Sequence, residues 1–365
     1  MKPFFIGFSF LFLLSSSRLF SQSVTPLRIP TTTVSFLTFT PDARSAAMGE
    51  AGVALSADAN SAYWNASKLP FAERDFGASA SYTPWLRTIA DGMWLGYASA
   101  YKKLGEGQVV SASVNYFNTG IHPTVTGKEY NSSFAINATY AKQLGRNFSI
   151  GLTLKYISSN MDGNLNFNPG NVKPGKGIAA DLSVYYKREY RDENTGQNRI
   201  WSFGAVLSNF GTKINYRSGV DESFIPTTFK LGGGLSFTPD GRNRFNFILD
   251  VRKLMVPTPI AGVNVNKKPL LQGVFGSFSD APGGFKEEIQ EVTLSGGAEY
   301  WYKGIFALRG GYFGQNKNKG NRKYFTAGAG VRILKNYGVD FSYLFPVTEG
   351  SPLAQTLRGT LSVYL

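Results

Sequence analysis

The chain of 365 residues has no cysteine and only one histidine. The absence of cysteine excludes disulfides and cysteine-ligated metal sites. His122 is the only histidine, so the chain has almost no residues for a Ser-His-Asp triad, for histidine-based acid catalysis or for ordinary zinc ligation. We therefore expect no enzyme activity, no cofactor and no metal site.

Charged residues and long apolar runs are also scarce. Charged residues make up 17% of the chain and aromatic residues 15%, and there are 41 glycines, which is typical of turn-rich β structure rather than of a disordered chain. Because no 18 consecutive residues are apolar, no membrane-spanning helix is expected in the mature protein. The net charge of +14 fits nucleic acid, anionic lipid or an acidic protein as partner and does not choose among them.

The first 21 residues have the features of a secretory signal peptide. Lys2 precedes an apolar stretch from Phe4 to Leu14, and small polar residues follow it. We predict cleavage after Ser21, with Gln22 as the first mature residue. A transmembrane anchor is the alternative, although the apolar stretch is shorter than the roughly 20 residues that span a bilayer. Export to the bacterial envelope argues against nucleic acid as a partner.

From residue 75 to residue 365 the apolar residues recur with a period of two, which is the period of β-strands. In one example Phe148, Ile150 and Leu152 alternate with Ser149 and Gly151. Fourteen such segments are predicted, near residues 75–83, 92–101, 107–117, 132–142, 147–157, 177–188, 199–209, 226–237, 243–252, 291–302, 304–313, 323–333, 337–345 and 356–365.

Charged residues within these segments lie on the face opposite the main apolar rows. A membrane barrel explains this segregation, because Arg or Lys facing the bilayer centre costs roughly 2–4 kcal/mol. Tyrosines near the ends of the apolar rows fit the lipid headgroup level. A soluble two-sheet sandwich with the apolar faces turned inward is the alternative. The charged residues are Lys155, Asp181, Lys230, Asp250, Arg252, Glu299, Arg309, Arg332, Asp340 and Arg358, for which we expect mainly internal ion pairing.

The predicted links alternate between short and long, as in outer-membrane barrels with short periplasmic turns and long outer loops. This alternation predicts an all-β, 14-stranded antiparallel transmembrane barrel with its N-terminal region and its C-terminus on the periplasmic side. The sixth link, near residues 189–197, is too long for a tight turn and is predicted to be an extended periplasmic hairpin. His122 and the links after the odd-numbered segments are placed in outer loops.

Residues 22–74, which precede the barrel at 75–365, lack this periodicity. They are too apolar for a disordered tail and contain a run of small residues from Ser45 to Gly52, which permits close packing inside a tube. A brief helical stretch, capped by Asp58 or Asn60, is expected to end at Pro70. We predict that 22–74 is a hatch that plugs the barrel; a simple loop-and-helix cap is the alternative.

The long link from Lys253 to Gln290 is unusually apolar for a loop. We predict that it docks on a partner or cargo protein; a lid folded over the barrel mouth is the alternative. The basic run at 315–323 is either solvated or meets lipopolysaccharide phosphates or an acidic cargo face. The residues of the proposed docking surface are Leu254, Met255, Leu270, Leu271, Val274, Phe275, Phe278 and Phe285.

Several short motifs resemble the PorV family of the type IX secretion system of Bacteroidetes, which is related to FadL fatty-acid channels. They are Phe36-Leu37-Thr38, Pro41-Asp42-Ala43-Arg44, Met48-Gly49, Ala57-Asp58-Ala59-Asn60-Ser61, Tyr63-Trp64-Asn65 and Ser81-Tyr82-Thr83-Pro84-Trp85-Leu86. One departure is Asn65-Ala66-Ser67, where FadL-like hatches usually have Asn-Pro-Ala, so the rigid turn of that proline is missing.

This resemblance implies a non-enzymatic, FadL-like outer-membrane barrel whose hatch includes Asp42, Arg44, Met48, Asn60, Trp64 and Asn65. It further implies a carrier that docks on the SprA-type translocon, takes up cargo through its C-terminal signal domain, and passes it to a PorU-type sortase complex for surface attachment. A FadL-type channel for the uptake of hydrophobic small molecules is the second hypothesis. An envelope hydrolase that uses a lumenal carboxylate is the third.

Overall fold

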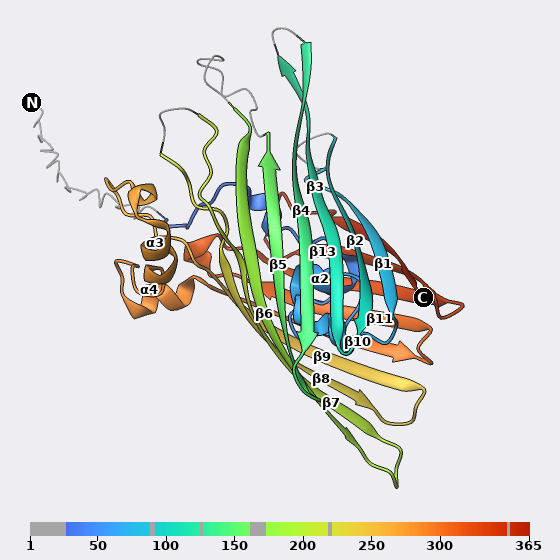
Figure 1. Ribbon diagram of the computed structural model, residues 1–365. Helices are drawn as coiled ribbons and strands as arrows, with labels where there is room; N and C mark the ends of the chain where they lie inside the picture. Colours follow the sequence, from blue (N-terminus) through green and yellow to red (C-terminus); the bar gives the residue numbers. More distant parts are fainter. Residues whose placement is uncertain (1–26, 88–91, 125–126, 161–172, 218–220, 349–350) are drawn as a thin grey trace, which may run out of the picture.

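The computed structural model describes residues 27–87, 92–124, 127–160, 173–217, 221–348 and 351–365. In these residues fourteen strands form one closed antiparallel barrel, in which each strand pairs with its neighbours in sequence and β1 pairs with β14 (Figure 1). The alternative of a two-sheet sandwich is therefore wrong. The signal peptide predicted for residues 1–21 and its cleavage site lie outside the described residues.

All fourteen predicted strands are present. The main difference lies at β3 and β4, which continue to Thr124 and from Gly127 where a longer loop was expected, so that His122 lies in a strand opposite Glu129. The strands are β1 (Phe76–Pro84), β2 (Met93–Gly105), β3 (Gln108–Thr124), β4 (Gly127–Gln143), β5 (Phe148–Ser159), β6 (Gly175–Arg191), β7 (Asn198–Gly211), β8 (Thr228–Thr238), β9 (Asn243–Leu254), β10 (Val292–Tyr302), β11 (Phe306–Gly314), β12 (Lys323–Ile333), β13 (Tyr337–Pro346) and β14 (Leu357–Tyr364).

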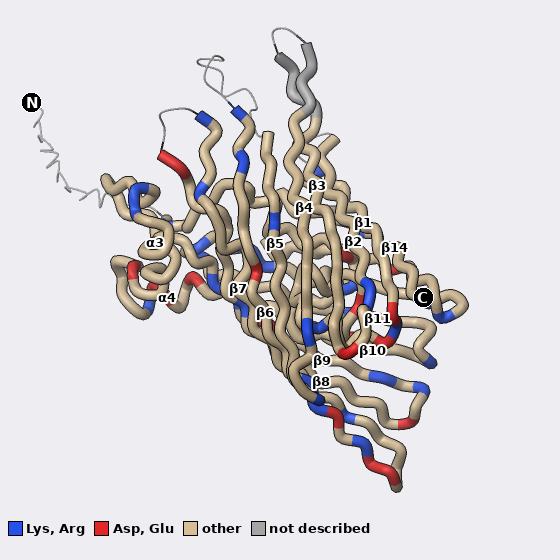
Figure 2. Tube along the Cα trace, in the orientation of Figure 1, with Lys and Arg blue, Asp and Glu red and all other residues tan. Residues whose placement is uncertain are grey.

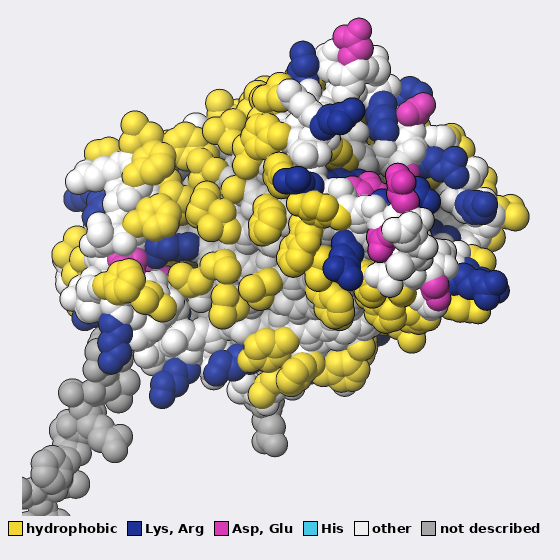
Figure 3. Space-filling model, turned by 90° about the horizontal axis from the view of Figure 1, so that it is seen from below, with side chains coloured by type: hydrophobic (Ala, Val, Ile, Leu, Met, Phe, Trp, Pro, Cys, Tyr) yellow, Lys and Arg dark blue, Asp and Glu magenta, His cyan; other side chains and the backbone are white. Residues whose placement is uncertain are grey.

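The barrel wall is apolar outside and polar inside. In β5 Leu154 is 58% exposed, whereas Ser149 on the opposite face is fully buried. The predicted strand charges follow the same rule, since Asp181, Glu299 and Arg309 are buried on the inner face. Figure 3 shows hydrophobic side chains spread over the wall, with charged ones gathered mainly toward one end. This distribution is the reverse of that in a soluble domain.

The connections define two ends of the barrel. The turn end carries six connections of two to six residues: 106–107, 144–147, 192–197, 239–242, 303–305 and 334–336. The loop end carries the other seven, of which the one between β9 and β10 is the longest. The predicted extended hairpin is β6 and β7, which project beyond the other strands at the turn end and carry many charges (Figures 1 and 2).

Residues 28–72, here called the inner segment, run from the loop end through the barrel to β1. They contain η1 (Ser35–Thr38), α1 (Ala43–Ala46), α2 (Ser61–Trp64) and η2 (Ala66–Phe71). Pro70 lies inside η2 instead of ending the preceding helix. Both Asp58 and Asn60 were candidate caps for α2; Asn60 takes the N-cap position but makes no side-chain cap, while Asp58 accepts hydrogen bonds from Asn60 N and Ser61 Oγ.

The start of the inner segment corrects one expectation. We expected this region at the turn end, where β1 begins. Instead, Thr33 N donates to Phe224 O in the β7–β8 connection, and Arg28 forms an ion pair with Glu287 of the β9–β10 connection. The segment therefore spans the barrel from one end to the other.

Residues 255–291, here called the outer insertion, connect β9 to β10 at the loop end. They fold into η4 (Val265–Lys267), α3 (Leu270–Gly276) and α4 (Phe285–Gln290), which lie to one side of the barrel in Figure 1. A last short helix, η5 (Lys317–Lys319), lies between β11 and β12. None of the helices in the described part of the chain is both long and apolar enough to cross a membrane.

Candidate functional site: the inner segment and the outer insertion

The inner segment is hydrogen-bonded to the inner face of strands around the whole barrel. Its backbone N–H groups donate to Thr360 of β14, to Thr326 of β12 and, through Gly52 and Val53, to Asp250 of β9. Further bonds join it to Ser79 of β1, Ser99 of β2, Ser149 of β5, Ser183 of β6 and Ser202 of β7. The small polar residues of the inner face thus satisfy an irregular backbone that is buried away from water.

A chain of buried ion pairs fixes the middle of the segment. The Arg44 guanidinium contacts Glu299 of β10 at 2.8 Å and Asp58 of the same segment at 3.0 Å. Glu299 also contacts Arg309 of β11, which in turn reaches Asp340 of β13 at 2.8 Å. Burial lowers the pKa of Arg44, but Glu299 and Asp58 outweigh burial and raise it well above its ordinary value. Because every charge has a partner of opposite sign, the network is held together as a unit.

The other predicted hatch residues lie along the same segment and are all buried. Asp42 caps α1 by accepting from Ser45 N, and its second oxygen accepts from Trp64 Nε1 at 2.6 Å. Burial, followed by the charge of Asp58, raises the pKa of Asp42. Asn60 accepts from Ser79 Oγ of β1.

Asn65 holds the turn at residues 65–67 with hydrogen bonds. Its Nδ2 donates to Val53 O and to Val184 O of β6, and its Oδ1 accepts from Ser67 N. Nearby, the Lys68 ammonium donates to Gly52 O, and burial lowers the pKa of Lys68 to about 8. Sequence reasoning did not single out Lys68, because nothing in its surroundings in the sequence marks it as buried.

Glycines of the strands make room for the segment. A Cβ added at Gly297 of β10 would lie 2.6 Å from Met48 Cα, and one at Gly311 of β11 would lie 2.1 Å from Gly49 N. Gly232 and Gly234 of β8 are similarly close to Val53 and Ala54. These glycines of β8, β10 and β11 therefore mark positions where the inner segment packs closely against the wall.

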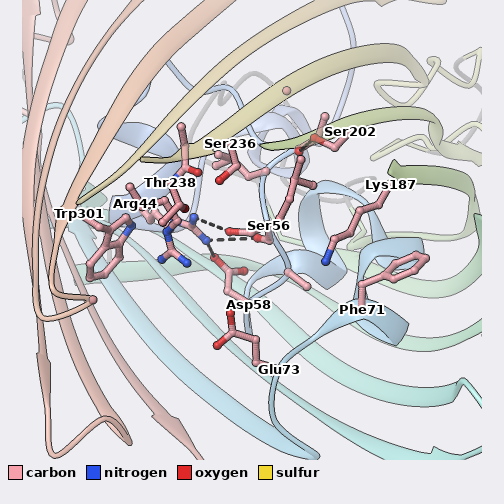
Figure 4. Close-up of a pocket in the computed structure, with 18 of the residues that line it drawn as sticks. Arg44, Ser56, Asp58, Phe71, Glu73, Lys187, Ser202, Ser236, Thr238 and Trp301 are labelled. Carbon is pink, nitrogen blue, oxygen red and sulfur yellow. Dashed lines mark hydrogen bonds and ion pairs between the residues drawn. The ribbon is translucent and has the colours of Figure 1, made fainter. Parts of the chain in front are cut away.

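Two cavities lie inside the barrel, and the inner segment forms part of the wall of both. The cavity at the turn end has a volume of about 590 Å³ and is lined by polar and charged side chains, among them Arg44, Asp58, Glu73 and Lys187 (Figure 4). The cavity at the loop end has a volume of about 340 Å³ and mixes rings with cations, among them Phe39, Tyr63, Lys230 and Arg252.

The outer insertion has an apolar core of its own. Met255, Val256 and Val274 are buried together with Phe224 of the β7–β8 connection. Ion pairs join the insertion to the barrel, since Lys253 of β9 contacts Glu288 and Glu291, and Lys319 of η5 contacts Glu287 and Glu291. Lys319 of the basic run is therefore buried rather than solvated or free for lipopolysaccharide.

The predicted docking residues divide into two groups. Met255 and Val274 are buried, and Leu254 and Leu270 are partly buried against the same core, so these four belong to the interior of the insertion. The other four, Leu271, Phe275, Phe278 and Phe285, are exposed, and Phe285 is exposed to 81%. We call these four residues the outer apolar surface. The insertion is packed on the barrel and still presents apolar side chains to its surroundings.

The predicted ion pairing on the inner face is confirmed for most of the charges. Lys155 pairs with Asp181, Arg332 with Asp340, and Arg358 with Glu50 of the inner segment. Among the described residues, Lys230 and Arg252 form no ion pair within 4.0 Å, although both lie close enough to Asp250 to interact with its charge. The sequence already indicated that some cations would lack an ion pair, because the predicted inner face holds six basic and four acidic residues.

The part of the chain that the structure describes contains no group of three or more His, Asp or Glu residues that could hold a metal ion. The inner carboxylates Asp181, Asp250, Glu299 and Asp340 accept from cations or from backbone amides.

The sequence matches a known family. The family model described as type IX secretion system protein PorV matches residues 22–261, which is well over half of the chain. The chain belongs to the PorV family. The resemblance noted from short motifs is thus confirmed, and this membership assigns the chain to the type IX protein secretion system. The match ends within the outer insertion.

Comparisons with other proteins add less. Among curated proteins, none is similar enough in sequence to count as a match. The toluene transporter TodX of P. putida is 10% identical, with a TM-score of 0.49 over 89% of this chain and 98% of that one. The toluene transporter TbuX of Ralstonia pickettii is 11% identical, with a TM-score of 0.45 over 89% and 98%. The barrel architecture of this chain is established by its own strand pairing.

Proposed function

We propose that this PorV-family barrel is an outer-membrane carrier of the type IX secretion system. It docks on the SprA-type translocon, binds the C-terminal signal domains of cargo and passes the cargo to a PorU-type attachment complex at the cell surface. Family membership carries this proposal. The outer apolar surface supports it, because exposed apolar patches on folded elements commonly bind proteins.

Placement in a membrane rests on the barrel wall. Exposed side chains such as Ile150, Leu152 and Leu154 of β5 continue on the neighbouring β6 with Ile178 and Leu182. In water such a wall would drive aggregation, whereas in a bilayer it is solvated by lipid acyl chains. Closure of the sheet through β1 and β14 leaves no unpaired strand edge facing the lipid. With this placement, the turn end, including the β6–β7 hairpin, is periplasmic and the loop end faces outward.

The filled lumen supports a carrier over a channel. The inner segment acts as a hatch, since it is hydrogen-bonded to strands on all sides and anchored by Arg44 to Glu299. Uptake through the lumen would require these bonds to break. A carrier that works through its outer apolar surface leaves them in place.

The test is capture of the translocon from native membranes by tagged chains. Replacing Phe275 and Phe285 together by Ser removes two exposed rings and leaves the buried core residues Met255, Val256 and Val274 unchanged. We expect the tagged wild-type chain to bring down a very large translocon and cargo signal domains, and the double variant to lose them. Leu334→Ser, at an exposed site in a turn at the other end, is the matched control.

Equal capture by wild type and the double variant would overturn the assignment of this surface. If the wild-type chain captured only lipids and no secretion protein, the carrier proposal itself would fail. Bound hydrophobic small molecules in that sample would instead favour the uptake channel.

A further inference from the structure

The outer faces of β6 and β7 change in the same order toward the turn end. Each strand presents aliphatic side chains first, and rings and one arginine after them. In a bilayer this order corresponds to the passage from acyl chains to headgroups. In that order the outward residues are Leu182, Val184, Tyr186, Arg188 and Tyr190 on β6, and Leu207, Ala205, Phe203, Trp201 and Arg199 on β7.

The alternation of the two strands separates the arginines from the lumen. Lys187, Glu189 and Ile200 line the turn-end cavity, whereas their sequence neighbours Arg188 and Arg199 are exposed on the outside of the barrel. The charged hairpin in Figure 2 therefore has two faces, one toward the lumen and one toward the surroundings of the barrel. The two arginines belong to the second.

The register brings the arginines together. Arg188 pairs with Trp201, and Tyr190 pairs with Arg199, so the two arginines are diagonal neighbours across β6 and β7. Diagonal neighbours in a sheet are about 7–8 Å apart, which lets two long side chains reach one group between them. The Arg188 guanidinium lies 4.9 Å from the ring of Tyr190, and that of Arg199 lies 5.5 Å from the ring of Phe237 on β8. The rings hold both guanidiniums in place.

Both guanidiniums keep their N–H donors free. In the described part of the chain neither forms a hydrogen bond or an ion pair. Glu189 faces the lumen and accepts from Asn198 Nδ2 at 2.6 Å. Asp192 in the turn is close enough to interact with the charge of Arg199, but it accepts from Asn194 N within its own turn. The outward residues of the two strands thus include two cations and no carboxylate.

This arrangement fits a phosphate at the surface of a membrane. A guanidinium binds phosphate oxygens through two parallel N–H groups, and one phosphate between Arg188 and Arg199 also relieves their mutual repulsion. Each cation at a membrane surface favours anionic over uncharged lipid about fivefold. Trp201, next to both arginines, is the residue type that prefers the boundary between acyl chains and headgroups.

We propose that the outer face of β6 and β7 at the turn end binds the headgroup of an anionic phospholipid. Arg188 and Arg199 hold its phosphate, Trp201 lies against its glycerol region, and its acyl chains lie along Leu182 and Val184. The inference rests on the membrane placement given under the proposed function and uses neither the lumen nor the outer apolar surface. The bound lipid fixes the depth at which the projecting hairpin leaves the membrane.

Fluorescence of Trp201 in bilayers tests this site. The full chain is reconstituted in phosphatidylcholine bilayers that contain a rising share of brominated phosphatidylglycerol or of brominated phosphatidylcholine, both of which quench tryptophan on contact. The same series with Trp201→Phe gives the signal of the other tryptophans, which is subtracted. We expect phosphatidylglycerol to be favoured over phosphatidylcholine at Trp201 by about fivefold or more. Equal quenching by the two lipids would overturn the site.

Variants assign the preference to the two arginines. Arg188→Gln combined with Arg199→Gln should abolish the preference for phosphatidylglycerol. Arg191→Gln is the matched control, because Arg191 is exposed on the same strand but on the opposite face. Quenching by brominated phosphatidylcholine should be the same in all three chains, which shows that each variant is folded and inserted. A preference that persists in the double variant would contradict the assignment.

Two further outcomes separate this inference from others. Inorganic phosphate in excess should leave the preference unchanged; if phosphate abolishes it, the arginines bind a free anion and the lipid site is refuted. Quenching of Trp201 by neither brominated lipid would contradict the membrane placement itself. Equal quenching by both would refute only the lipid site and leave that placement intact.

Discussion

The inner segment and the outer insertion are both irregular stretches attached to the same barrel, but they differ in the side chains that they bury and expose. The inner segment places its polar groups against the polar inner face and leaves few groups without a partner. The outer insertion buries one set of apolar residues and exposes another, including Phe275 and Phe285.

This difference indicates which region can bind and release a partner at low cost. Buried ion pairs and backbone bonds, such as those of Arg44 and Asp250, are specific to one geometry and costly to break singly. Exposed rings lose nothing when a partner covers them and gain from leaving water. The comparison supports the proposal that the inner segment stays in place and that the outer insertion binds partners.

The largest effect is expected for Arg44→Met, which leaves Glu299 and Asp58 with one cation fewer in a buried network. We expect a loss of about 3–5 kcal/mol in the free energy of unfolding. Urea unfolding followed by tryptophan fluorescence in detergent micelles measures it. Arg28→Met removes a partly exposed ion pair with Glu287 and should cost about 1 kcal/mol or less. Similar losses in both variants would remove the distinction between the two regions.

A smaller effect is expected for Gly297→Ala, whose new Cβ would lie 2.6 Å from Met48 Cα. The segment must shift, so we expect a loss of about 1–3 kcal/mol by the same urea titration. Gly145→Ala is the matched control, because a Cβ there meets open space. A stable Gly297→Ala variant would mean that the segment is loosely held.

The smallest effects on the free energy of unfolding are expected within the outer insertion, where a buried and an exposed residue can be compared. Val274 and Phe275 are neighbours on α3, one fully buried and the other exposed. Val274→Ala should cost about 1–2 kcal/mol through lost burial, whereas Phe275→Ala should change the free energy of unfolding by less than about 0.5 kcal/mol. The opposite order would place Phe275 in the core and remove it from the docking surface.

The barrel could be predicted from the sequence because its signal is local. A period of two, with charges confined to one face, determines both the strands and which face points inward. In the predicted segment 243–252, Ile248 is the single apolar residue on the polar face. It is buried on the inner face in a cluster with Met48 and Ala51 of the inner segment. No strand pattern contains this information, since it depends on what fills the lumen.

The outer insertion could be predicted only in part. Its apolar content indicated buried surface, but Val274 and Phe275 are both apolar, and only the fold of α3 against Met255 and Phe224 decides which one is exposed. The path of the inner segment was missed for a related reason. Its contact with the loop end depends on Arg28 and Glu287, which are 259 residues apart in the sequence.

A disulfide between the inner segment and the wall tests the central claim most directly. The chain has no cysteine, and the side chains of Asn60 and Ser79 are hydrogen-bonded at 2.7 Å, so Asn60→Cys with Ser79→Cys brings two thiols together at that site, and loss of free thiol on oxidation shows that they have joined. The measurement is display of cargo on cells that carry this variant, oxidised or reduced. We predict equal display in both states, because secretion uses the outer surface while the lumen stays closed. Loss of display on oxidation, with recovery on reduction, would contradict this account.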